Sequence, residues 1–431
     1  RQRVEIYHTY AKSLVERGLA YPCFCTEEEL DKVRAKQEED KVLTGYYGEY
    51  ATCRNLSYEE IEANIKAGKP YVLRLRSQGS PDKEITFVDA IKGEIKLPEN
   101  IHDIVLLKKD GIPTYHFAHA IDDHLMRTTT VVRGGEWLAS APIHYELFHL
   151  LGFKMPAYAH TAHLMKFDEE TGGKRKLSKR KDPELSLDYY RKDGYHPYTM
   201  KVYLLTLLNS NFEEWHEKFP DKDINEFPFS VEKMNQSGAL FDKDKLHNIC
   251  KNELSKLSEE ELYDFLYDWA KENEPENVEK WFGDREKMLQ ILRLYMGVGA
   301  KRRRKDLMYA KQIFELISYF FDGESAEEMD EFKLDEDMVS KILKSYLAKY
   351  DHNDDNSVWF NKLKEIADEH GFASDMKAYK ANPENFKGNV SDIAEAVRIA
   401  VTGRANTPDL WTIVHIMGEE QMTERIKKHI K

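Results

Sequence analysis

The segment Lys174–Lys181, KRKLSKRK, concentrates positive charge, because six of its eight residues are lysine or arginine. The glycine pair Gly172–Gly173 precedes it and Asp182-Pro183 follows it, which predicts a short, mobile loop. Lysines in such a loop can bind a polyphosphate and stabilise the charge that develops as a phosphate bond breaks, and Ser178 can bond a phosphate oxygen. The segment therefore indicates nucleotide binding; a solvated basic loop is the alternative.

The composition is that of a folded protein with several domains. The chain has 431 residues, of which 41% are hydrophobic and 12% aromatic, so packed cores are expected. The formal net charge of -13 argues against a general nucleic-acid binder but permits local basic patches. No apolar run approaches the ~18 residues of a membrane helix, and four cysteines are too few for a disulfide scaffold. A soluble protein of a reducing compartment is expected.

Strands and helices alternate around the basic segment in the first part of the chain. Runs of β-branched and aromatic residues predict the strands, and the spacing of Ile143, Leu147 and Leu150 predicts a helix between them. This order is half of a parallel α/β sheet, which binds ligands at the carboxyl ends of its strands. The expected strands are Tyr71–Ser77, Glu84–Asp89, Asp103–Lys109, Thr114–Ala118, Thr128–Gly135 and Pro156–Leu164.

Helix signals dominate the remainder of the chain. Met200–Asn211 is a strongly apolar helical segment, and almost every segment beyond Leu257 is amphipathic. The C-terminal half is therefore expected to be all helical. Capping boxes that predict helix starts are Thr26 with Glu29, Ser57 with Glu60, and Ser258 with Glu261.

Several segments precede the basic one in a fixed order: Gly111–His144 (GIPTYHFAHAIDDHLMRTTTVVRGGEWLASAPIH), then Tyr158–His160 (YAH), then Lys176–Arg180 (KLSKR). In this order they resemble the bacterial-type glutamyl-tRNA synthetases, which are class I aminoacyl-tRNA synthetases. The resemblance continues through NSNFEEW, SGALFD and TGRANTPDL and covers essentially the whole chain. It implies that ATP, with Mg2+, activates L-glutamate as glutamyl-adenylate and that the acyl group then passes to the 3′ end of tRNA(Glu).

The resemblance implies roles for residues of the basic segment. Lysines there would neutralise the leaving pyrophosphate, with Lys179 the foremost candidate. The implied ATP-binding residues are Lys176, Leu177, Ser178, Lys179 and Arg180, of which Lys176, Ser178 and Lys179 are the candidate catalytic residues.

The resemblance also implies a glutamate pocket formed by Tyr115, His119, Arg133 and Trp137. The Arg133 guanidinium can hold a carboxylate by two parallel hydrogen bonds, which would disfavour glutamine. A structural salt bridge is the alternative. His119 stands where relatives often carry Asn, and Gly135 where they usually carry an acid. The pair Asp122-Asp123 is expected to be structural and not catalytic.

Cysteines form a further candidate site. Cys23–Cys25 provides two thiols and Cys53 a third, and some members of the family bind a structural zinc ion with such a set. The residue two positions beyond the third cysteine is Asn55, a poor zinc ligand, so Tyr47 or Tyr50 would supply the fourth bond. Packing of small core residues is the alternative.

The second basic run, Lys301–Lys305, falls where the family contacts the tRNA. Phosphate contacts would make binding depend on salt, and anticodon bases can stack on aromatic or arginine side chains. The candidate tRNA-binding residues are Arg303, Arg398, Arg404 and Trp411.

The implied fold is α/β plus all-α, with a partial class I Rossmann-like nucleotide-binding domain. A cytoplasmic monomer is expected. The predicted parts are 1–105, the end of the first Rossmann half with an inserted acceptor-arm-binding domain; 106–190, the second Rossmann half with the KLSKR loop; 191–290, a helical stem-contact domain; and 291–431, an α-helical anticodon-binding domain.

The other class I motif, His-x-Gly-His, does not occur among the 16 histidines. The sequence opens without Met inside a helical pattern, so a segment upstream of Arg1 is expected and the chain as given is expected to be catalytically impaired. Two alternatives stay open: a non-discriminating synthetase that also charges tRNA(Gln), and a tRNA-binding regulatory relative without catalysis. A purely structural helical scaffold does not explain the ordered motifs.

Overall fold

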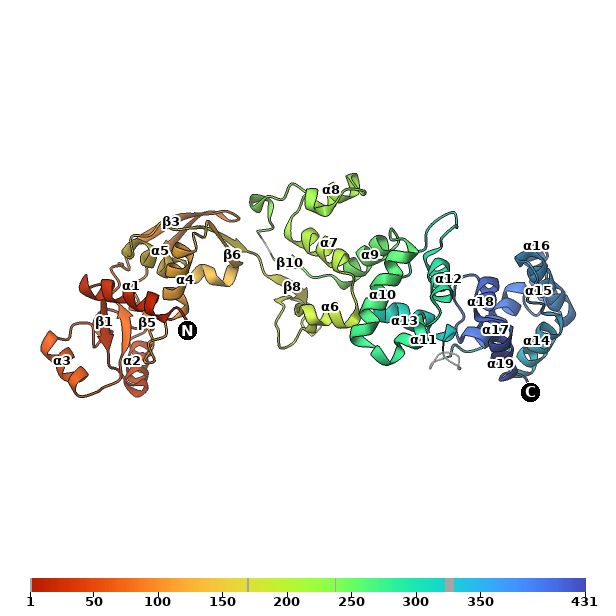
Figure 1. The fold of residues 1–431 in the computed structure, drawn as a ribbon, viewed down its shortest axis with the longest axis horizontal. Helices are drawn as coiled ribbons and strands as arrows, with labels where there is room; N and C mark the ends of the chain where they lie inside the picture. Colours follow the sequence, from red (N-terminus) through yellow and green to blue (C-terminus); the bar gives the residue numbers. More distant parts are fainter. Residues whose placement is uncertain (1, 169, 237, 322–328) are drawn as a thin grey trace. The chain divides into compact units, whose positions relative to one another are not determined.

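The computed structural model describes residues 2–168, 170–236, 238–321 and 329–431 (Figure 1). The chain forms two compact units, one made of Arg1–Lys176 and Leu205–Phe241, the other of Leu177–Leu204 and Asp242–Lys431. The first unit mixes strands with helices and the second is built from helices, so the expected α/β plus all-α class is confirmed. The boundary between the units falls inside the basic segment. The finer four-part division stays a prediction.

A three-stranded antiparallel sheet, in the order β1-β2-β5, opens the first unit. The first helix packs on this sheet through Tyr7, Ala11 and Leu14, which are buried at helical spacing. The capping boxes expected for the next two helices are present. The elements are α1 (Val4–Glu16), β1 (Ala20–Cys23), α2 (Glu27–Glu39), α3 (Tyr58–Lys66), β2 (Val72–Leu75) and β5 (Val105–Leu107).

A buried carboxylate, Asp103, links the segments of this sheet. Its side chain is 0% exposed and pairs with Arg54. It also accepts a hydrogen bond from the Tyr21 hydroxyl at 2.5 Å and one from the Ser77 backbone N–H at 2.9 Å. The buried charge is therefore held by one cation and two neutral donors, the arrangement that a buried carboxylate requires.

A four-stranded sheet, in the order β4-β3-β7-β6, carries the candidate site. β7 runs parallel to both β3 and β6, whereas β3 and β4 form an antiparallel hairpin. The prediction of a parallel sheet is therefore confirmed for β3, β7 and β6 but is wrong for β4. The parallel register sets Arg133 of β6 beside His160 of β7. The elements are β3 (Glu84–Asp89), β4 (Gly93–Pro98), α4 (Tyr115–Leu125), β6 (Thr130–Gly134), α5 (Ala141–Leu150) and β7 (Ala157–Thr161).

The strand predicted at Thr114–Ala118 is wrong. Thr114 precedes the helix α4 in an extended conformation, and Tyr115 is already helical. The aromatic and β-branched residues that suggested a strand belong instead to an amphipathic helix, which buries Phe117, Ala120 and Ile121 against the core of the first unit. Tertiary packing overrides the local propensity here.

A small sheet in the order β10-β8-β9 holds the start of the basic segment. Lys174–Lys176 is strand β9, paired antiparallel with β8 (Leu164–Phe167), and β10 (Ala239–Leu240) pairs with β8 on its other side. The predicted loop is therefore confined to the residues after Lys176.

The helices of the second unit share one hydrophobic core that runs from Leu254 to Ile426. α14, α15, α17, α18 and α19 pack together towards the C-terminal end of the chain (Figure 1). Among the residues described, no helix is both long and apolar enough to cross a membrane. The helices are α6 (Leu187–Asp193), α9 (Lys243–Leu254), α10 (Glu259–Asn273), α11 (Val278–Phe282), α12 (Arg285–Met296), α13 (Ala310–Ile317), α14 (Glu336–Lys349), α15 (Asn356–His370), α16 (Met376–Ala381), α17 (Val390–Thr402), α18 (Leu410–Met417) and α19 (Glu419–Lys427), while α7 (Pro197–Leu208) is shared between the units and α8 (Phe212–Lys218) belongs to the first.

Candidate functional site

Arg133, at the end of β6, is the centre of the candidate site. Its Nε–H donates to Nε2 of His160 over 2.9 Å, and its Nη1–H donates to Nδ1 of His144 over 3.0 Å. A longer bond, 3.4 Å, joins Nη2 to the carbonyl oxygen of Trp137. The guanidinium carbon lies 4.6 Å from the centre of the Tyr158 ring. Every one of these partners is uncharged in this arrangement.

The charge of this arginine has no carboxylate partner within the part of the chain that the structure describes. Three of the five guanidinium N–H groups are used by the bonds just given. One N–H remains on each terminal nitrogen, which matches the two oxygens of a carboxylate. Arg133 is thus a half-buried cation that keeps both its charge and a pair of donors for a ligand.

Aromatic side chains gather next to Arg133. The Tyr115 ring lies 4.6 Å from that of Trp137 and stacks on that of His119 at 5.7 Å. Tyr115 and His119 are four residues apart on α4, so they lie on one face of the helix. Tyr115 is 50% exposed, so part of its side chain is accessible to a ligand. The structure therefore brings together all four residues that the sequence assigned to glutamate binding.

Both ring nitrogens of His119 contact other side chains of the protein. Its Nε2 lies 2.9 Å from the Tyr158 hydroxyl, and its Nδ1 lies 2.7 Å from Asp123. Burial lowers the pKa of His119. The neighbouring Asp122 accepts hydrogen bonds from Arg3 and Tyr7, so the structural interpretation of the Asp122-Asp123 pair is confirmed.

His144, on α5, was missed by the sequence prediction. It is 0% exposed, and its Nε2 lies 2.9 Å from Nδ1 of His116. Burial, together with the nearby His119 and Arg133, lowers the pKa of His144 to about 2. The imidazole is therefore neutral at physiological pH.

His160 and Asp89, on β7 and β3, were missed as well. Nδ1 of His160 lies 2.6 Å from an Asp89 oxygen, and both side chains are 0% exposed. Asp89 also accepts hydrogen bonds from the backbone N–H groups of Ile91 and Lys92. Burial alone would raise the pKa of Asp89, but the bonds from His160 and from these backbone groups outweigh it, and the pKa is lowered.

The basic segment is anchored at Leu177. This side chain is only 2% exposed, whereas Lys179 and Arg180 are exposed. The Ser178 N–H donates to a carboxylate oxygen of the buried Asp182 over 2.7 Å, which closes a tight turn. The cations are therefore presented at the tip of a turn whose base is fixed.

The first lysine of the predicted ATP site has a different environment. Nζ of Lys176, in the first unit, lies 3.8 Å from a carboxylate oxygen of Glu136. Glu136 immediately precedes Trp137 and also lies 3.3 Å from Nδ1 of His163. Lys176 is thereby linked to the stretch that contains Trp137, a hydrogen-bond partner of Arg133.

Comparison with known proteins identifies the family. A family described as the catalytic domain of the class I (E and Q) tRNA synthetases matches residues 1–248, and an anticodon-binding domain matches residues 261–430. A glutamate–tRNA ligase from Acetivibrio thermocellus is 53% identical over 99% of this chain and 78% of its own length. The chain belongs to the class I glutamyl-tRNA synthetase family. A second relative, a glutamate–tRNA ligase from Clostridium perfringens strain SM101, is 46% identical over 100% of this chain and 78% of its own length.

The fold of this synthetase also matches solved structures. A crystal structure of a glutamate–tRNA ligase from Elizabethkingia meningosepticum, in complex with its amino acid, superposes with a TM-score of 0.74 at 25% identity. It covers 99% of the synthetase chain and 82% of its own. The resemblance seen in the sequence motifs is therefore confirmed at the level of the fold.

The predicted zinc ligands of the synthetase lie together. The sulfurs of Cys23, Cys25 and Cys53 are all within 4.8 Å of one another. Hydrogen bonds from Cys25 and Cys53 lower the pKa of the Cys23 thiol, whereas hydrogen bonds with Cys23 and Cys25 raise the pKa of the Cys53 thiol. The Tyr46 hydroxyl lies 3.4 Å from the sulfur of Cys23 and 3.3 Å from that of Cys25.

The two tyrosines that the sequence analysis offered as the fourth zinc ligand have hydroxyls bonded elsewhere in the protein. The hydroxyl of Tyr47 donates to the Leu43 carbonyl, and that of Tyr50 donates to Asp40. Tyr46 instead points at the thiols. The turn after Tyr46 brings Cys53 next to it, and the Cys53 N–H donates to the Tyr46 hydroxyl over 2.9 Å.

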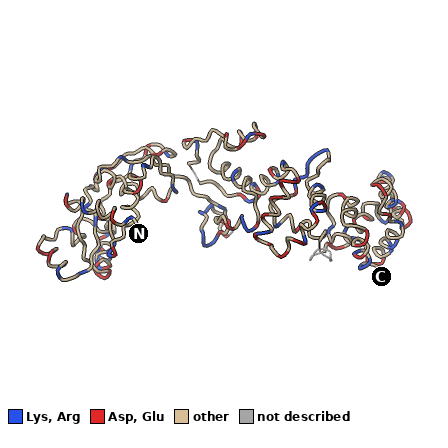
Figure 2. The backbone as a smooth tube through the Cα atoms, viewed as in Figure 1, with Lys and Arg blue, Asp and Glu red and all other residues tan. Residues whose placement is uncertain are grey.

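The second basic run borders a cavity of about 750 Å³ between α12 and α18. Arg293, Arg302 and Arg304 line it together with His415 and Pro408. Figure 2 shows the loop after α12 as a stretch of positive charge. Sequence reasoning selected Arg303, between the two loop arginines that line the cavity.

The other predicted tRNA contacts make bonds within the protein. Trp411 donates its indole N–H to the Asp354 carbonyl over 3.0 Å. Arg398 bonds the Ala405 carbonyl at 3.3 Å, and burial lowers its pKa. Arg404 donates to the Glu315 carbonyl through one terminal nitrogen.

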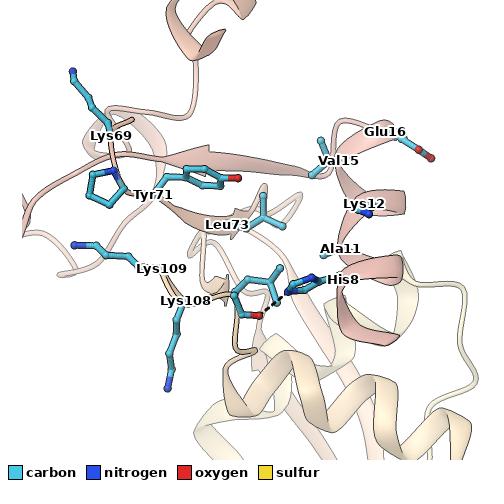
Figure 3. A pocket seen from close by; sticks show the side chains of 13 residues that line it. His8, Ala11, Lys12, Val15, Glu16, Lys69, Tyr71, Leu73, Lys108 and Lys109 are labelled. Carbon is cyan, nitrogen blue, oxygen red and sulfur yellow. Dashed lines mark hydrogen bonds between the residues drawn. The ribbon is translucent and has the colours of Figure 1, made fainter. Parts of the chain in front are cut away.

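A lysine-lined hollow lies in the first unit of the synthetase (Figure 3). Its volume is about 540 Å³, and Lys12, Lys69, Lys108 and Lys109 surround an apolar floor. On α1, His8 bonds the Gly111 carbonyl at 2.8 Å and fixes one wall. Sequence reasoning missed these lysines because they are scattered along the chain.

Proposed function

We propose that this synthetase ligates L-glutamate to tRNA(Glu), with ATP as the activating substrate. An oxygen of the glutamate α-carboxylate attacks the α-phosphorus of ATP, and the bond to pyrophosphate breaks. A ribose hydroxyl at the 3′ end of the tRNA then attacks the acyl carbon, and AMP leaves. The observation that carries the proposal is the uncompensated charge of Arg133, held by neutral partners beside an aromatic wall.

Arg133 selects glutamate through its two remaining N–H groups. The side-chain carboxylate of glutamate accepts from both, and it brings the opposite charge. Glutamine would set its own amide N–H group against one of these donors, which leaves a donor without an acceptor in a partly buried site. Tyr115 and Trp137 cover the aliphatic part of the substrate.

The turn after Leu177 supplies the charge for the ATP step. Lys179 and Arg180 at its tip neutralise the pyrophosphate as it leaves, while Ser178 bonds a phosphate oxygen. Lys176, linked to Glu136, acts from the neighbouring strand. The buried Leu177 and Asp182 act by holding the turn in place.

The thiols of Cys23, Cys25 and Cys53 fit a structural zinc ion, with the Tyr46 hydroxyl as the fourth ligand. Tetrahedral zinc holds sulfur at ~2.3 Å, which sets neighbouring sulfurs a little under 4 Å apart. The 3.6 Å separation of the Cys25 and Cys53 sulfurs agrees with this geometry. The ion would cross-link the start of α2 to the turn around Cys53.

The tRNA is bound through dispersed basic surfaces. The arginine-lined cavity beside α18 suits splayed anticodon bases with their phosphates, and the lysine-lined hollow suits the acceptor arm. Arg303, Arg398, Arg404 and Trp411 stay candidates at the border of the first surface. The synthetase acts as a monomer in the cytoplasm, where its thiols stay reduced.

The test is aminoacylation by the purified enzyme with purified tRNA(Glu) and tRNA(Gln). Arg133→Gln removes the positive charge and the two N–H donors that would bind the carboxylate, so kcat/KM for glutamate falls by about 100-fold. Arg34→Gln, on the exposed face of α2, is the matched control and leaves it unchanged. Normal kcat/KM in Arg133→Gln refutes the assignment. Charging of tRNA(Gln) identifies a non-discriminating enzyme, and no charging of either tRNA by the full-length protein favours the regulatory alternative.

A further inference from the structure

The partners of Arg133 are unusual for a partly buried arginine. Such a cation is ordinarily held by a carboxylate, which would neutralise it and compete with an acidic ligand. Here two imidazole nitrogens, one of His144 and one of His160, take that place at 3.0 and 2.9 Å. A neutral acceptor fixes the direction of an N–H group without cancelling the charge of the guanidinium.

Hydrogen-bond donors and acceptors fix the proton positions of this network. A guanidinium only donates, so Nδ1 of His144 and Nε2 of His160 accept and carry no proton. The proton of His144 is therefore on Nε2, where it donates to Nδ1 of His116. The proton of His160 is on Nδ1, where it donates to the buried Asp89.

We propose that His144 and His160 are positioning residues, a neutral clamp that orients Arg133 and preserves its full charge for the glutamate side chain. Asp89 and His116 complete the clamp by fixing the tautomers of the two imidazoles. This inference rests on the proposed glutamate-binding role of Arg133 and explains how the protein keeps that arginine selective for an acid. A clamp made of carboxylates would hold the guanidinium as firmly but would weaken its preference for glutamate over glutamine.

The discriminating experiment is a pair of isosteric substitutions at His144. His144→Asn keeps a neutral oxygen acceptor at the position of Nδ1, whereas His144→Asp puts a carboxylate there. In aminoacylation assays we expect the KM for glutamate to stay within about threefold in His144→Asn and to rise at least about tenfold in His144→Asp, because a neutralised guanidinium loses a charged hydrogen bond. The KM for ATP should change in neither variant, and the ratio of kcat/KM for glutamate to that for glutamine should fall in His144→Asp alone.

A merely structural histidine would give a different pattern. A new ion pair with Arg133 would then leave glutamate binding intact, so equal KM values for glutamate in the two His144 variants would overturn the inference. Arg133→Lys separates this failure from failure of the proposed function. If Arg133→Lys also leaves the KM for glutamate unchanged, Arg133 does not bind the substrate; if it raises that KM while both His144 variants are normal, only the clamp is refuted.

A measurement on the unaltered protein covers the case in which His144→Asp does not fold. Nitrogen-15 NMR of histidine-labelled enzyme reports the protonation of each ring nitrogen. We expect His144 to carry its proton on Nε2 and His160 on Nδ1 throughout pH 6 to 8 (about the range in which free histidine titrates). A cationic form of either residue in that range, or the opposite tautomer, would overturn the clamp.

Discussion

The buried His144 makes the stability of the first unit depend on pH. Its pKa is lowered from 6.5 to about 2 by burial and by the adjacent cationic and histidine side chains. The folded state therefore keeps this imidazole neutral, while the unfolded chain takes up a proton below pH 6.5. Because the unfolded state binds the extra proton, stability is complete above pH 6.5 and is lost as the pH falls towards 2.

The magnitude follows from the size of the shift. Each pH unit between the two pKa values costs about 1.4 kcal/mol of unfolding free energy. Lowering the pH from 6.5 to 5 should therefore remove about 2 kcal/mol through His144 alone. His116, His119 and His160 add to this loss, because burial lowers the pKa of each of them as well.

The assay is urea unfolding from pH 5 to 8, with the α5 peptides followed by pulse-labelling hydrogen exchange. In His144→Asn, the slope of unfolding free energy against pH below 6 should be shallower by about 1.4 kcal/mol per unit. His149→Asn is the control, since His149 lies exposed on the same helix. An unchanged slope in His144→Asn would refute the reasoning, because the buried imidazole would then not be the group that resists protonation.

Three further outcomes are expected. Lys179→Ala should slow glutamyl-adenylate formation by about 100- to 1000-fold in single-turnover assays, because one group that stabilises the leaving pyrophosphate is lost; an unchanged rate would remove Lys179 from the site. Cys25→Ser should lower the zinc content measured by mass spectrometry, whereas Cys250→Ser, whose buried thiol lies 3.6 Å from the Thr199 hydroxyl, should not; equal zinc in both speaks against the thiol site. Asp103→Asn should lower the unfolding free energy by about 3 kcal/mol in urea titrations, because Arg54 loses its charged partner; a loss below about 1 kcal/mol would contradict this account.

Local signals in the sequence were sufficient for much of the framework. The capping boxes at Thr26, Ser57 and Ser258 each begin a helix, because their hydrogen bonds close within four residues. The strand predicted at Thr128–Gly135 is β6 (Thr130–Gly134), and the ordered motifs identify the family correctly. These features depend on residues that are close together in the chain.

Errors arose where the structure of a short segment was predicted without knowledge of the residues that pack against it. Because Thr114–Ala118 was predicted to be a strand, the helical spacing of Tyr115, His116 and His119 was not recognised. In the helix α4 these three side chains lie close together. A helical interpretation would have indicated a histidine cluster. The sequence also did not indicate that Tyr46, and not Tyr47 or Tyr50, lies beside the three thiols, because the direction of a tyrosine in a turn depends on where the chain folds back.

The sequence by itself supplied the candidate residues for the proposed chemistry, since the charge of Arg133 and the lysines of the basic segment are properties of residue type and order. Only the tertiary structure decided what surrounds them. His144 comes from a helix, His160 from a neighbouring strand and Asp89 from the strand beyond it, and the parallel register of β6 and β7 sets which side chains meet. The setting of Arg133 among neutral hydrogen-bond partners results from that register and from burial, and neither is encoded in any short stretch of the chain.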